Sequence, residues 1–210
     1  IYNKDGININ NLEKYKLKNN SIINFPNTKK ISSSNDLLTY ECDILIPAAL
    51  ENAITLKNVN SINTKLICEA ANGPISYRAD KKLNEKGITI IPDIYANAGG
   101  VAVSYFEWIR NTSHIRMGRL NKRYEENRGD TIIKAIKHLS KETLPQTLID
   151  KLVYGADEKD IVASGLEDTM RMAFQEILEF KAKYKLANYR MAAYAIALKK
   201  IEKSYLELGI

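Results

Sequence analysis

The stretch Asn97-Ala-Gly-Gly-Val-Ala-Val-Ser-Tyr-Phe-Glu-Trp108 is the part of the sequence that most restricts the fold. It follows an apolar run, residues 88–93, and begins with an asparagine and two glycines. Glycine lets the backbone approach a ligand closely and adopt a positive φ. From Val101 we expect a helix, so residues 97–100 would lie at its N-terminus. The unpaired N–H groups there suit an anionic ligand or cofactor.

One face of this expected helix carries a single hydroxyl among apolar side chains. The residues spaced i, i+3, i+4 and i+7 are Val101, Ser104, Tyr105 and Trp108. A lone polar group on an apolar surface can orient a bound small molecule. A core serine that bonds to its own helix backbone explains the same pattern, and from this stretch alone it is the simpler interpretation.

Three short apolar runs precede the helix, at residues 43–46, 65–68 and 87–91. Residues 76–86 between the second and third runs indicate a helix, with Ser76 as its N-cap and Gly87 just beyond its end. A shorter helix is expected within residues 51–58. Buried strands that alternate with helices predict a parallel sheet and an α/β fold.

Each run ends in small residues or in asparagine and glycine. The three segments are Pro47-Ala-Ala49, Ala71-Asn-Gly73 and Asn97-Ala-Gly-Gly100. Ligands of open α/β sheets bind at the C-terminal ends of the strands. Any one segment alone is most simply a turn, but three in succession predict a cleft. We interpret Glu69, at the end of the second run, as a structural carboxylate.

The second half of the chain is expected to be helical. Residues 131–144 carry a narrow apolar stripe, Gly118 and Gly129 are expected to interrupt the charged segment before it, and Pro145 ends or restarts a helix. Asp157 and Asn188 are expected to cap the last two helices. Their apolar stripes fit helices that pack back on a sheet.

Composition excludes several classes of protein. The chain has 210 residues, 45% of them hydrophobic, and a net charge of +6. No apolar run approaches the roughly 20 residues that span a bilayer. Cys42 and Cys68 lack a C-x-x-C spacing, so we expect reduced thiols in an intracellular protein. The chain has no initiator Met, and we expect it to be a fragment or a processed product.

Several site motifs are missing from the sequence. There is no G-x-G-x-x-G turn, no Walker-type loop, and no spacing of His, Cys or acidic residues that predicts a metal site. Ser104 has no histidine at a spacing that suggests a nucleophile. One basic cluster is interpreted as a solvated or intersubunit face rather than a nucleic-acid site: Arg110, Arg116, Arg119, Lys122 and Arg123.

Taken together, these motifs resemble the glutamate dehydrogenase family, which also includes leucine, phenylalanine and valine dehydrogenases. The segments at 43–49, 69–74 and 97–108 look like three of its signature segments, in its order. The segments at 157–162, 164–166 and 192–194 add to a resemblance that covers nearly the whole chain. Residues 1–8 look like the stretch that follows the second strand of the family's nucleotide-binding domain. The resemblance implies a partial Rossmann-like sheet that lacks its first strands, in a C-terminal fragment of a longer enzyme.

The resemblance also implies an activity, the oxidative deamination of L-glutamate to 2-oxoglutarate and ammonia with NAD or NADP. Ala48, Ala49 and Asn72 would lie against the nicotinamide half of the cofactor, and Asn97 would hold its amide or ribose. Val101 and Ser104 would contact the substrate, with the Ser104 hydroxyl bonding the γ-carboxylate. The family's catalytic lysines and aspartate belong to a substrate domain, so we expect no catalytic residue here and no turnover by this chain alone.

The interval after Trp108 resembles the antenna of hexameric family members from animals and some protists. We expect a dinucleotide-binding part at 1–110, an antenna-like insertion at 111–156, and a pivot helix with C-terminal helices at 157–210. Lys159 and Arg171 match regulatory residues that contact GTP and ADP in animal enzymes. Ala163 replaces a histidine of the GTP site, so weak or absent GTP inhibition with possible ADP activation is expected. Localisation in the mitochondrial matrix is implied, with the cytoplasm as the alternative.

Two other functions remain open. In the first, the chain would be part of a dehydrogenase of a branched-chain or aromatic amino acid, which would leave the Ser104 hydroxyl unused. In the second, it would be a non-catalytic module for nucleotide binding or oligomerisation. We expect neither nucleic acid nor a membrane as a partner.

Overall fold

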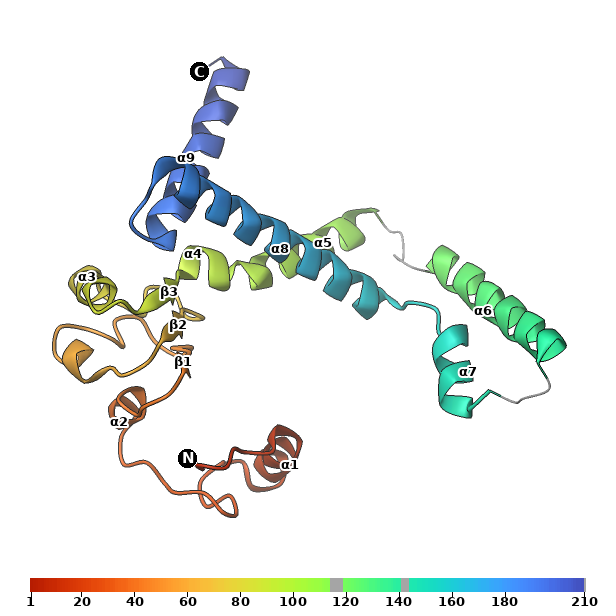
Figure 1. Cartoon of the computed structure of the whole chain (residues 1–210), viewed down its shortest axis with the longest axis horizontal. Coiled ribbons are helices and arrows are strands. Elements are labelled where there is room, and N and C mark those ends of the chain that lie inside the picture. Colours follow the sequence, from red (N-terminus) through yellow and green to blue (C-terminus); the bar gives the residue numbers. More distant parts are fainter. Residues whose placement is uncertain (114–118, 141–143, 210) are drawn as a thin grey trace. The chain divides into compact units, whose positions relative to one another are not determined.

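The computed structural model describes residues 1–113, 119–140 and 144–209 (Figure 1). The chain divides into two compact units, Ile1–Asp93 and Ile94–Ile210. It is mostly helical and contains a small parallel sheet in the first unit. Among the described residues, no helix is both long enough and apolar enough to span a membrane.

The sheet of the first unit has three parallel strands in the order β1-β2-β3. These are β1 (Ile44–Leu45), β2 (Leu66–Cys68) and β3 (Thr89–Ile91). Ile67 on the middle strand pairs with Leu45 on one side and with Ile90 on the other. The three apolar runs of the sequence therefore form the predicted parallel sheet, with shorter strands than the runs themselves.

One face of this sheet forms the core of the first unit. Helix α3 (Tyr77–Glu85) lies over it, begins at the predicted N-cap Ser76, and is followed by Gly87 with φ +78°. The buried residues of this core are Ile54, Val59, Ile62, Ile67, Ile75, Ala79, Leu83, Ile88 and Ile90. The strand residues between them point to the other face, where Ile44 is 55% exposed. The strands are therefore buried on one face only within this unit.

The short helix expected within residues 51–58 is absent. The backbone N–H groups of Asn52 and Ile54 donate instead to the carbonyls of Gly73 and Pro74, at 2.9 Å each. The Asn58 side chain accepts from the N–H of Thr55. The carbonyl of Ile54 also accepts from the N–H of Ser76 at 2.9 Å, so this segment pairs with residues 73–76 instead of with itself. Only a short 3-10 helix, η1 (Val59–Ser61), follows.

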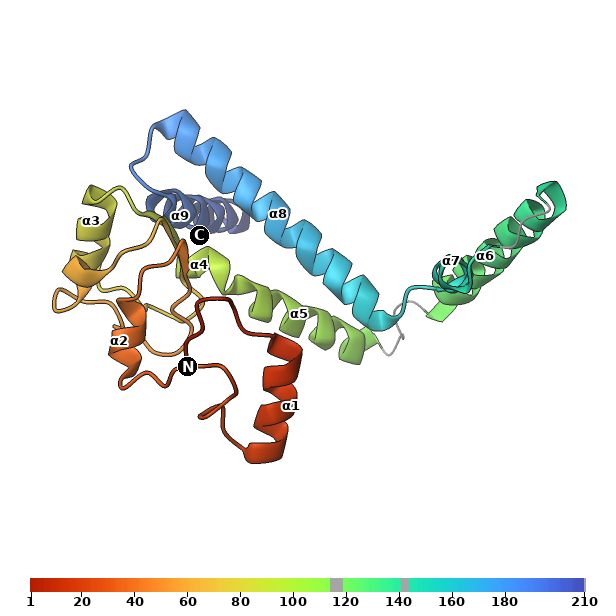
Figure 2. The ribbon, with the colours of Figure 1, turned by 60° about the horizontal axis from the view of Figure 1, so that its bottom comes forward.

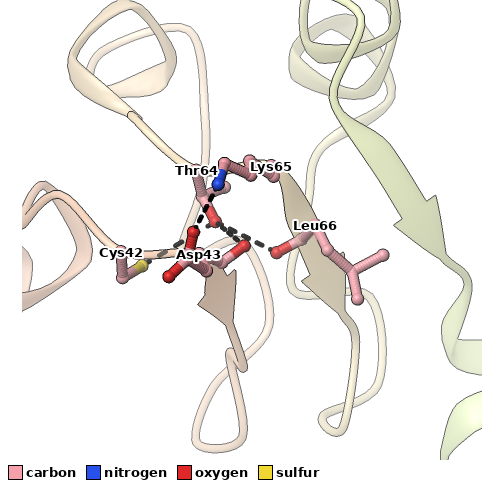
Figure 3. A network of polar contacts seen from close by, with 5 residues as sticks. All are labelled: Cys42, Asp43, Thr64, Lys65 and Leu66. Carbon is pink, nitrogen blue, oxygen red and sulfur yellow. Dashed lines mark hydrogen bonds and ion pairs between the residues drawn. The ribbon is translucent and has the colours of Figure 1, made fainter.

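A polar network joins the beginnings of β1 and β2 (Figure 3). The Lys65 Nζ lies 2.7 Å from Oδ1 of Asp43. The Thr64 hydroxyl lies 3.1 Å from the carbonyl oxygens of both Asp43 and Leu66, and the Cys42 thiol donates to that hydroxyl at 3.7 Å. The hydrogen bond from Lys65, together with its charge, lowers the pKa of the exposed Asp43 carboxyl. The network fixes the register of the two strands at the end opposite the candidate site.

Two helices precede the sheet. The spacing of Leu12, Tyr15 and Leu17 predicts a short helix within residues 10–20, and α1 (Ile9–Asn19) confirms it. The Asn8 side chain caps α1 by accepting from the N–H of Asn11. Residues 20–36 are weakly patterned and predict no element, but helix α2 (Ser34–Leu38) begins within them and is capped by Ser33. Each of these caps acts within three residues of sequence.

The second unit consists of helices. They are α4 (Asp93–Ala96, which starts on the last residue of the first unit), α5 (Ala98–Ser113), α6 (Arg119–Leu139), α7 (Gln146–Val153), α8 (Glu158–Tyr184) and α9 (Tyr189–Leu208). Helix α5 runs alongside α8 in both views (Figure 1, Figure 2). The buried core of this unit joins α8 to α9 through Ile177, Ala192, Ala193 and Ile196.

The predicted caps of the last two helices are confirmed. Asp157 and Asp160 form a reciprocal capping box at the start of α8, and Asn188 accepts from the N–H of Met191 at the start of α9. Helix α9 packs on α8 through Ala192, Ala193 and Ile196. The predicted apolar stripe occupies its opposite side and is largely exposed within this unit, so the expected packing of that stripe on a sheet stays a prediction.

Gly129 does not interrupt a helix, contrary to the expectation from sequence. Helix α6 continues through Gly129 without a break. Helix α7 lies so close to it that a methyl group on Gly129 would overlap the carbonyl oxygen of Leu152. The glycine is explained by helix packing rather than by a break. Gly118 and the end of the helix expected at 131–144 (residues 141–143) lie outside the described residues. Pro145 occupies the N-cap position of α7.

Candidate functional site

The C-terminal ends of β1 and β2 lie beside each other in the first unit. The carbonyl oxygen of Pro47 accepts from the N–H groups of Ala70 and Ala71, at 3.2 and 3.0 Å. These bonds hold the segment with Ala48 and Ala49 next to the segment with Asn72. Pro47 is buried, whereas all three candidate residues are exposed. Small side chains and one amide are therefore presented together at this edge.

A fully buried carboxyl group underlies the same edge. Glu69 has 0% exposure, and its Oε2 accepts from the backbone N–H of Asp93 at 2.8 Å. The Oδ2 of Asp93 in turn accepts from the backbone N–H of Gly73, also at 2.8 Å. The ends of β2 and β3 are thus joined by two consecutive side chain-to-backbone bonds.

Gly73 itself adopts a left-handed conformation with φ +53°. Its carbonyl accepts from the N–H of Asn52, so the turn after Asn72 is held on both sides. On the strand before the turn, burial raises the pKa of the Cys68 thiol, and the neighbouring Glu69 carboxylate raises it further. Cys68 is therefore a poor nucleophile at neutral pH.

Helix α5 carries the candidate residues of the second unit. Asn97 forms the turn between α4 and α5, and the helix begins at Ala98, three residues before the position expected from sequence. Gly99 and Gly100 are helical. Neither has a positive φ, although glycine would permit one at these positions. A Cβ on Gly99 would lie 3.4 Å from a methyl group of Leu166, so the missing side chain lets α8 approach.

The face of α5 that carries Ser104 is exposed in the second unit. Val101 is 74% exposed and Trp108 60%. The Ser104 hydroxyl donates to the carbonyl of Gly100 at 3.0 Å. The serine therefore bonds to its own backbone, as the simpler interpretation has it, but it is not a core residue. Its oxygen is accessible to a ligand with no loss of packing.

Tyr95 ties the start of this segment to the middle of α8. Its hydroxyl donates to the carbonyl of Met170 at 3.0 Å, and its ring lies 5.3 Å from that of Phe174. The sequence pattern singles out neither Tyr95 nor Asp93. An acidic residue in the first turn of a helix that closely follows a strand is the one local signal that points to Asp93.

The candidate regulatory residues lie on α8. Lys159 lines a groove of about 440 Å³ between α5 and the start of α8, beside the ion pair between Arg110 and Glu158 (2.9 Å). Arg171 is exposed and lies 3.4 Å from Glu167, one helical turn away. Arg110 thus has an intramolecular partner, whereas Arg116 of the basic cluster lies outside the described residues.

One groove of the first unit lies away from these residues. Its volume is about 850 Å³, and it is lined by the 52–58 loop and the start of α3, with none of Ala48, Ala49 or Asn72. Across the described ranges, no three His, Cys, Asp or Glu side chains are grouped so that they could hold a metal ion. The candidate cofactor and substrate residues therefore lie at the exposed strand edge of the first unit and on α5 and the turn before it in the second, three in each unit.

A parallel sheet with small residues at its C-terminal edge, followed by helices, defines the class of α/β proteins that bind ligands at strand ends. The model of the glutamate/leucine/phenylalanine/valine dehydrogenase family matches residues 1–157. The chain belongs to this family.

Relatives of known name support the assignment along the whole chain. A mitochondrial glutamate dehydrogenase of Dictyostelium discoideum is 47% identical over 209 residues, which are 100% of this chain and 41% of the relative. An NAD-specific glutamate dehydrogenase of Peptoniphilus asaccharolyticus is 49% identical over 53% of this chain and 26% of its own length. The crystal structure of the glutamate dehydrogenase from that organism matches 100% of this chain and 37% of its own, with a TM-score of 0.64 and 29% identity. The chain thus spans less than half the length of these relatives.

Proposed function

We propose that this chain forms part of a glutamate dehydrogenase, which converts L-glutamate, NAD(P)+ and water to 2-oxoglutarate, ammonium, NAD(P)H and a proton. Membership of the family and 47% identity to a glutamate dehydrogenase along the chain support the proposal. The observation that carries the choice of substrate is the accessible Ser104 hydroxyl on an otherwise apolar helix face. Such a group suits a substrate whose side chain ends in a carboxylate.

The edge formed by Ala48, Ala49 and Asn72 fits the nicotinamide half of NAD or NADP. The two methyl side chains admit a flat ring, and the Asn72 amide offers a donor and an acceptor to a carboxamide. Asn97 is proposed to bind the nicotinamide amide or its ribose. The cofactor, when bound, accepts the hydride from the substrate Cα. The residues of this chain orient the ring, and the proposal assigns the proton-transferring groups to the part of the enzyme outside this chain.

Val101 and Ser104 are proposed to contact the distal end of the substrate. In the structure the Ser104 hydroxyl donates to Gly100, and a substrate carboxylate would replace that carbonyl as acceptor. A hydrogen bond to a charged group contributes about 1.5–3 kcal/mol, because the charge strengthens it. This contact would favour glutamate over an apolar amino acid of similar length.

Substitution of Ser104 tests the proposed substrate. We expect Ser104→Ala to lower kcat/KM for glutamate by about 10- to 100-fold in an enzyme that contains this chain, and to leave the value for norvaline nearly unchanged. Ser204→Ala is the matched control, because Ser204 is an exposed helical serine that donates to its own backbone at 3.0 Å. Equal effects on both substrates would favour the alternative, a dehydrogenase of branched-chain or aromatic amino acids.

Regulation is proposed for α8, with Lys159 and Arg171 as the residues that meet nucleotide effectors. Because Ala163 replaces the histidine of the GTP-binding pattern, weak or absent inhibition by GTP and possible activation by ADP are expected. Rates measured while GTP and then ADP are added separately test this, and strong inhibition by GTP would refute it. The segment at 111–156 is proposed to be an antenna-like insertion between the dinucleotide-binding part and the C-terminal helices.

A homohexamer in the mitochondrial matrix is the proposed state of the whole enzyme, with a cytoplasmic location as the alternative. The resemblance to antenna-bearing enzymes supports the hexamer, and the similarity to a mitochondrial enzyme of Dictyostelium supports the compartment. The remaining candidate is a non-catalytic nucleotide-binding or oligomerising module. Size determination in solution, together with an assay for NAD(P)H formation, separates the two functions.

A further inference from the structure

The buried Glu69 carboxyl is the most fully enclosed acidic group of the first unit, and the proposed chemistry does not use it directly. Its Oε2 accepts from the backbone N–H of Asp93, the first residue of α4. That N–H belongs to the first turn of a helix, where no backbone acceptor is available. Glu69 therefore fixes the position of Asp93 relative to the end of β2.

Asp93 passes this constraint to the neighbouring loop. Its Oδ2 accepts from the N–H of Gly73, twenty residues away in sequence. Gly73 has a positive φ, and no heavy atom outside its own neighbours lies within 4 Å of a Cβ built there. The bond to Asp93 and the bond from the N–H of Asn52 to the Gly73 carbonyl hold the backbone of this turn on both sides.

We propose that Glu69 and Asp93 are positioning residues for the cofactor, which hold the Asn72–Gly73 turn so that the Asn72 amide meets the nicotinamide carboxamide. Glu69 orients Asp93, and Asp93 orients Gly73. This inference rests on the proposed function, because it needs Asn72 as a cofactor contact. Neither carboxyl group touches the cofactor, so neither is a catalytic residue.

A purely structural role for these residues predicts something different. If a buried polar group serves only stability, its replacement by an apolar side chain leaves its hydrogen-bond partner unsatisfied. Such a replacement would change the free energy of unfolding and leave cofactor binding unaffected. A positioning role requires that the KM for cofactor rise even where the enzyme stays folded, and that a variant retaining an acceptor oxygen restore it.

The first measurement tests the coupling in the 210-residue chain itself. Amide hydrogen exchange at Gly73, followed by NMR, should be faster in Asp93→Ala than in the unchanged chain, and Asp93→Asn should restore most of the protection because its Oδ1 still accepts. Glu69→Met should speed exchange at the Asp93 amide and, through it, at Gly73. Unchanged exchange at Gly73 in Asp93→Ala would overturn the proposal.

The second measurement uses an enzyme that carries this chain together with a substrate-binding part, its own or that of the Dictyostelium relative. Asp93→Ala should raise the KM for cofactor about tenfold, the equivalent of about 1.4 kcal/mol for one lost hydrogen bond, with a smaller change in the KM for glutamate. Glu85→Met, at the exposed end of α3, is the matched control and should change neither. Asp93 is only partly buried, so its variants give the result even where Glu69→Met fails to fold.

Asn72→Ala separates the inference from the function on which it rests. If Asn72→Ala raises the KM for cofactor and Asp93→Ala does not, the positioning role is wrong and the proposed cofactor site stands. If neither variant raises the KM for cofactor, the positioning role and the proposed cofactor site are both wrong. If both raise it and Asp93→Asn restores it, the positioning role is supported.

Discussion

Gly73 shows how a single residue's conformation supports the proposed site. Its φ of +53° is one that side chains with a Cβ adopt only at a cost, and the space around its Cα is open. We expect Gly73→Ala to lower the free energy of unfolding by about 1 kcal/mol, entirely through backbone conformation. Chemical denaturation of the 210-residue chain measures it.

Asparagine provides the control at this position. Asn20, Asn24, Asn27 and Asn52 all adopt a positive φ in this chain, between 51° and 65°. Gly73→Asn should therefore recover part of the loss that Gly73→Ala causes, because asparagine tolerates this region better than alanine. Equal destabilisation by both substitutions would point to a steric cause instead and would contradict the explanation.

The bond between Tyr154 and Asp160 gives a prediction for pH dependence. The Tyr154 hydroxyl donates to Oδ2 of Asp160 at 2.7 Å, and this bond raises the pKa of Tyr154 to about 12. The same bond, with a smaller contribution from the Asp157 N–H, lowers the pKa of the Asp160 carboxyl. Folding thus favours the phenol form of Tyr154. Its contribution to the free energy of unfolding is complete below the unfolded tyrosine pKa of 10.0 and is lost as pH rises towards 12. The contribution of Asp160 is present above its unfolded value of 3.8 and is lost as pH falls through its lowered pKa.

Ultraviolet absorbance of the phenolate measures this titration, with Tyr154→Phe identifying the signal. In Asp160→Asn the carboxylate acceptor and its charge are gone, and Tyr154 should then titrate closer to 10.0. A Tyr154 titration that is the same in both proteins would show that the bond is absent in solution.

At the scale of helices, two glycines predict opposite effects of the same substitution. Gly129 lies inside α6 against the Leu152 carbonyl, where an added methyl group has no room. A Cβ on Gly165, inside α8, would lie 3.6 Å from the Phe106 ring, an ordinary contact. We expect Gly129→Ala to destabilise the pairing of α6 with α7 by about 1–3 kcal/mol through overpacking. Gly165→Ala should instead stabilise α8 by up to about 1 kcal/mol, since alanine favours helix.

Hydrogen exchange of the α6, α7 and α8 amides resolves the two effects in one experiment. Faster exchange confined to α6 and α7 is expected for Gly129→Ala, and slower exchange in α8 for Gly165→Ala. Stabilisation by both substitutions would show that α6 and α7 do not pack this closely.

The elements that sequence predicts well are those set by local interactions. The caps Asp157 and Asn188 act within three residues of sequence, and Gly87 ends α3 through its own conformation. The segment 51–58 could not be predicted, because its backbone bonds to residues 73 and 74 replace the helix that its own sequence allows. Gly129 is misread for the same reason, since its role depends on Leu152 in another helix.

The candidate site also combines features set by local interactions with features set by contacts between distant residues. Strand-end segments and the backbone bond of Ser104 follow from local pattern, and the structure shows both. The connection from Glu69 to Asp93 spans 24 residues and that from Asp93 to Gly73 spans 20. No periodicity within either segment contains that information, so Glu69 appears in the sequence only as a structural carboxylate. The roles of the site residues towards cofactor and substrate come from family resemblance and stay predictions.

At the scale of the whole molecule, we expect the chain to supply contacts for cofactor and substrate, and another part of the enzyme to supply the groups that move protons. It covers 41% of the Dictyostelium relative, and the family pattern assigns the catalytic lysines and aspartate to a substrate domain that it does not match. We therefore expect no NAD(P)H formation from glutamate by the 210-residue polypeptide, at any cofactor concentration. A chimera in which this chain replaces the matched segment of the Dictyostelium enzyme should be active, because the chain is 47% identical to that enzyme over 209 residues. In that chimera Ser104→Ala should impair turnover of glutamate, which ties the activity to this chain. Deamination by the isolated polypeptide would show instead that a proton-transferring group lies among its own residues, and Glu69 and Asp93, at the proposed nicotinamide edge, would be the first to examine by substitution.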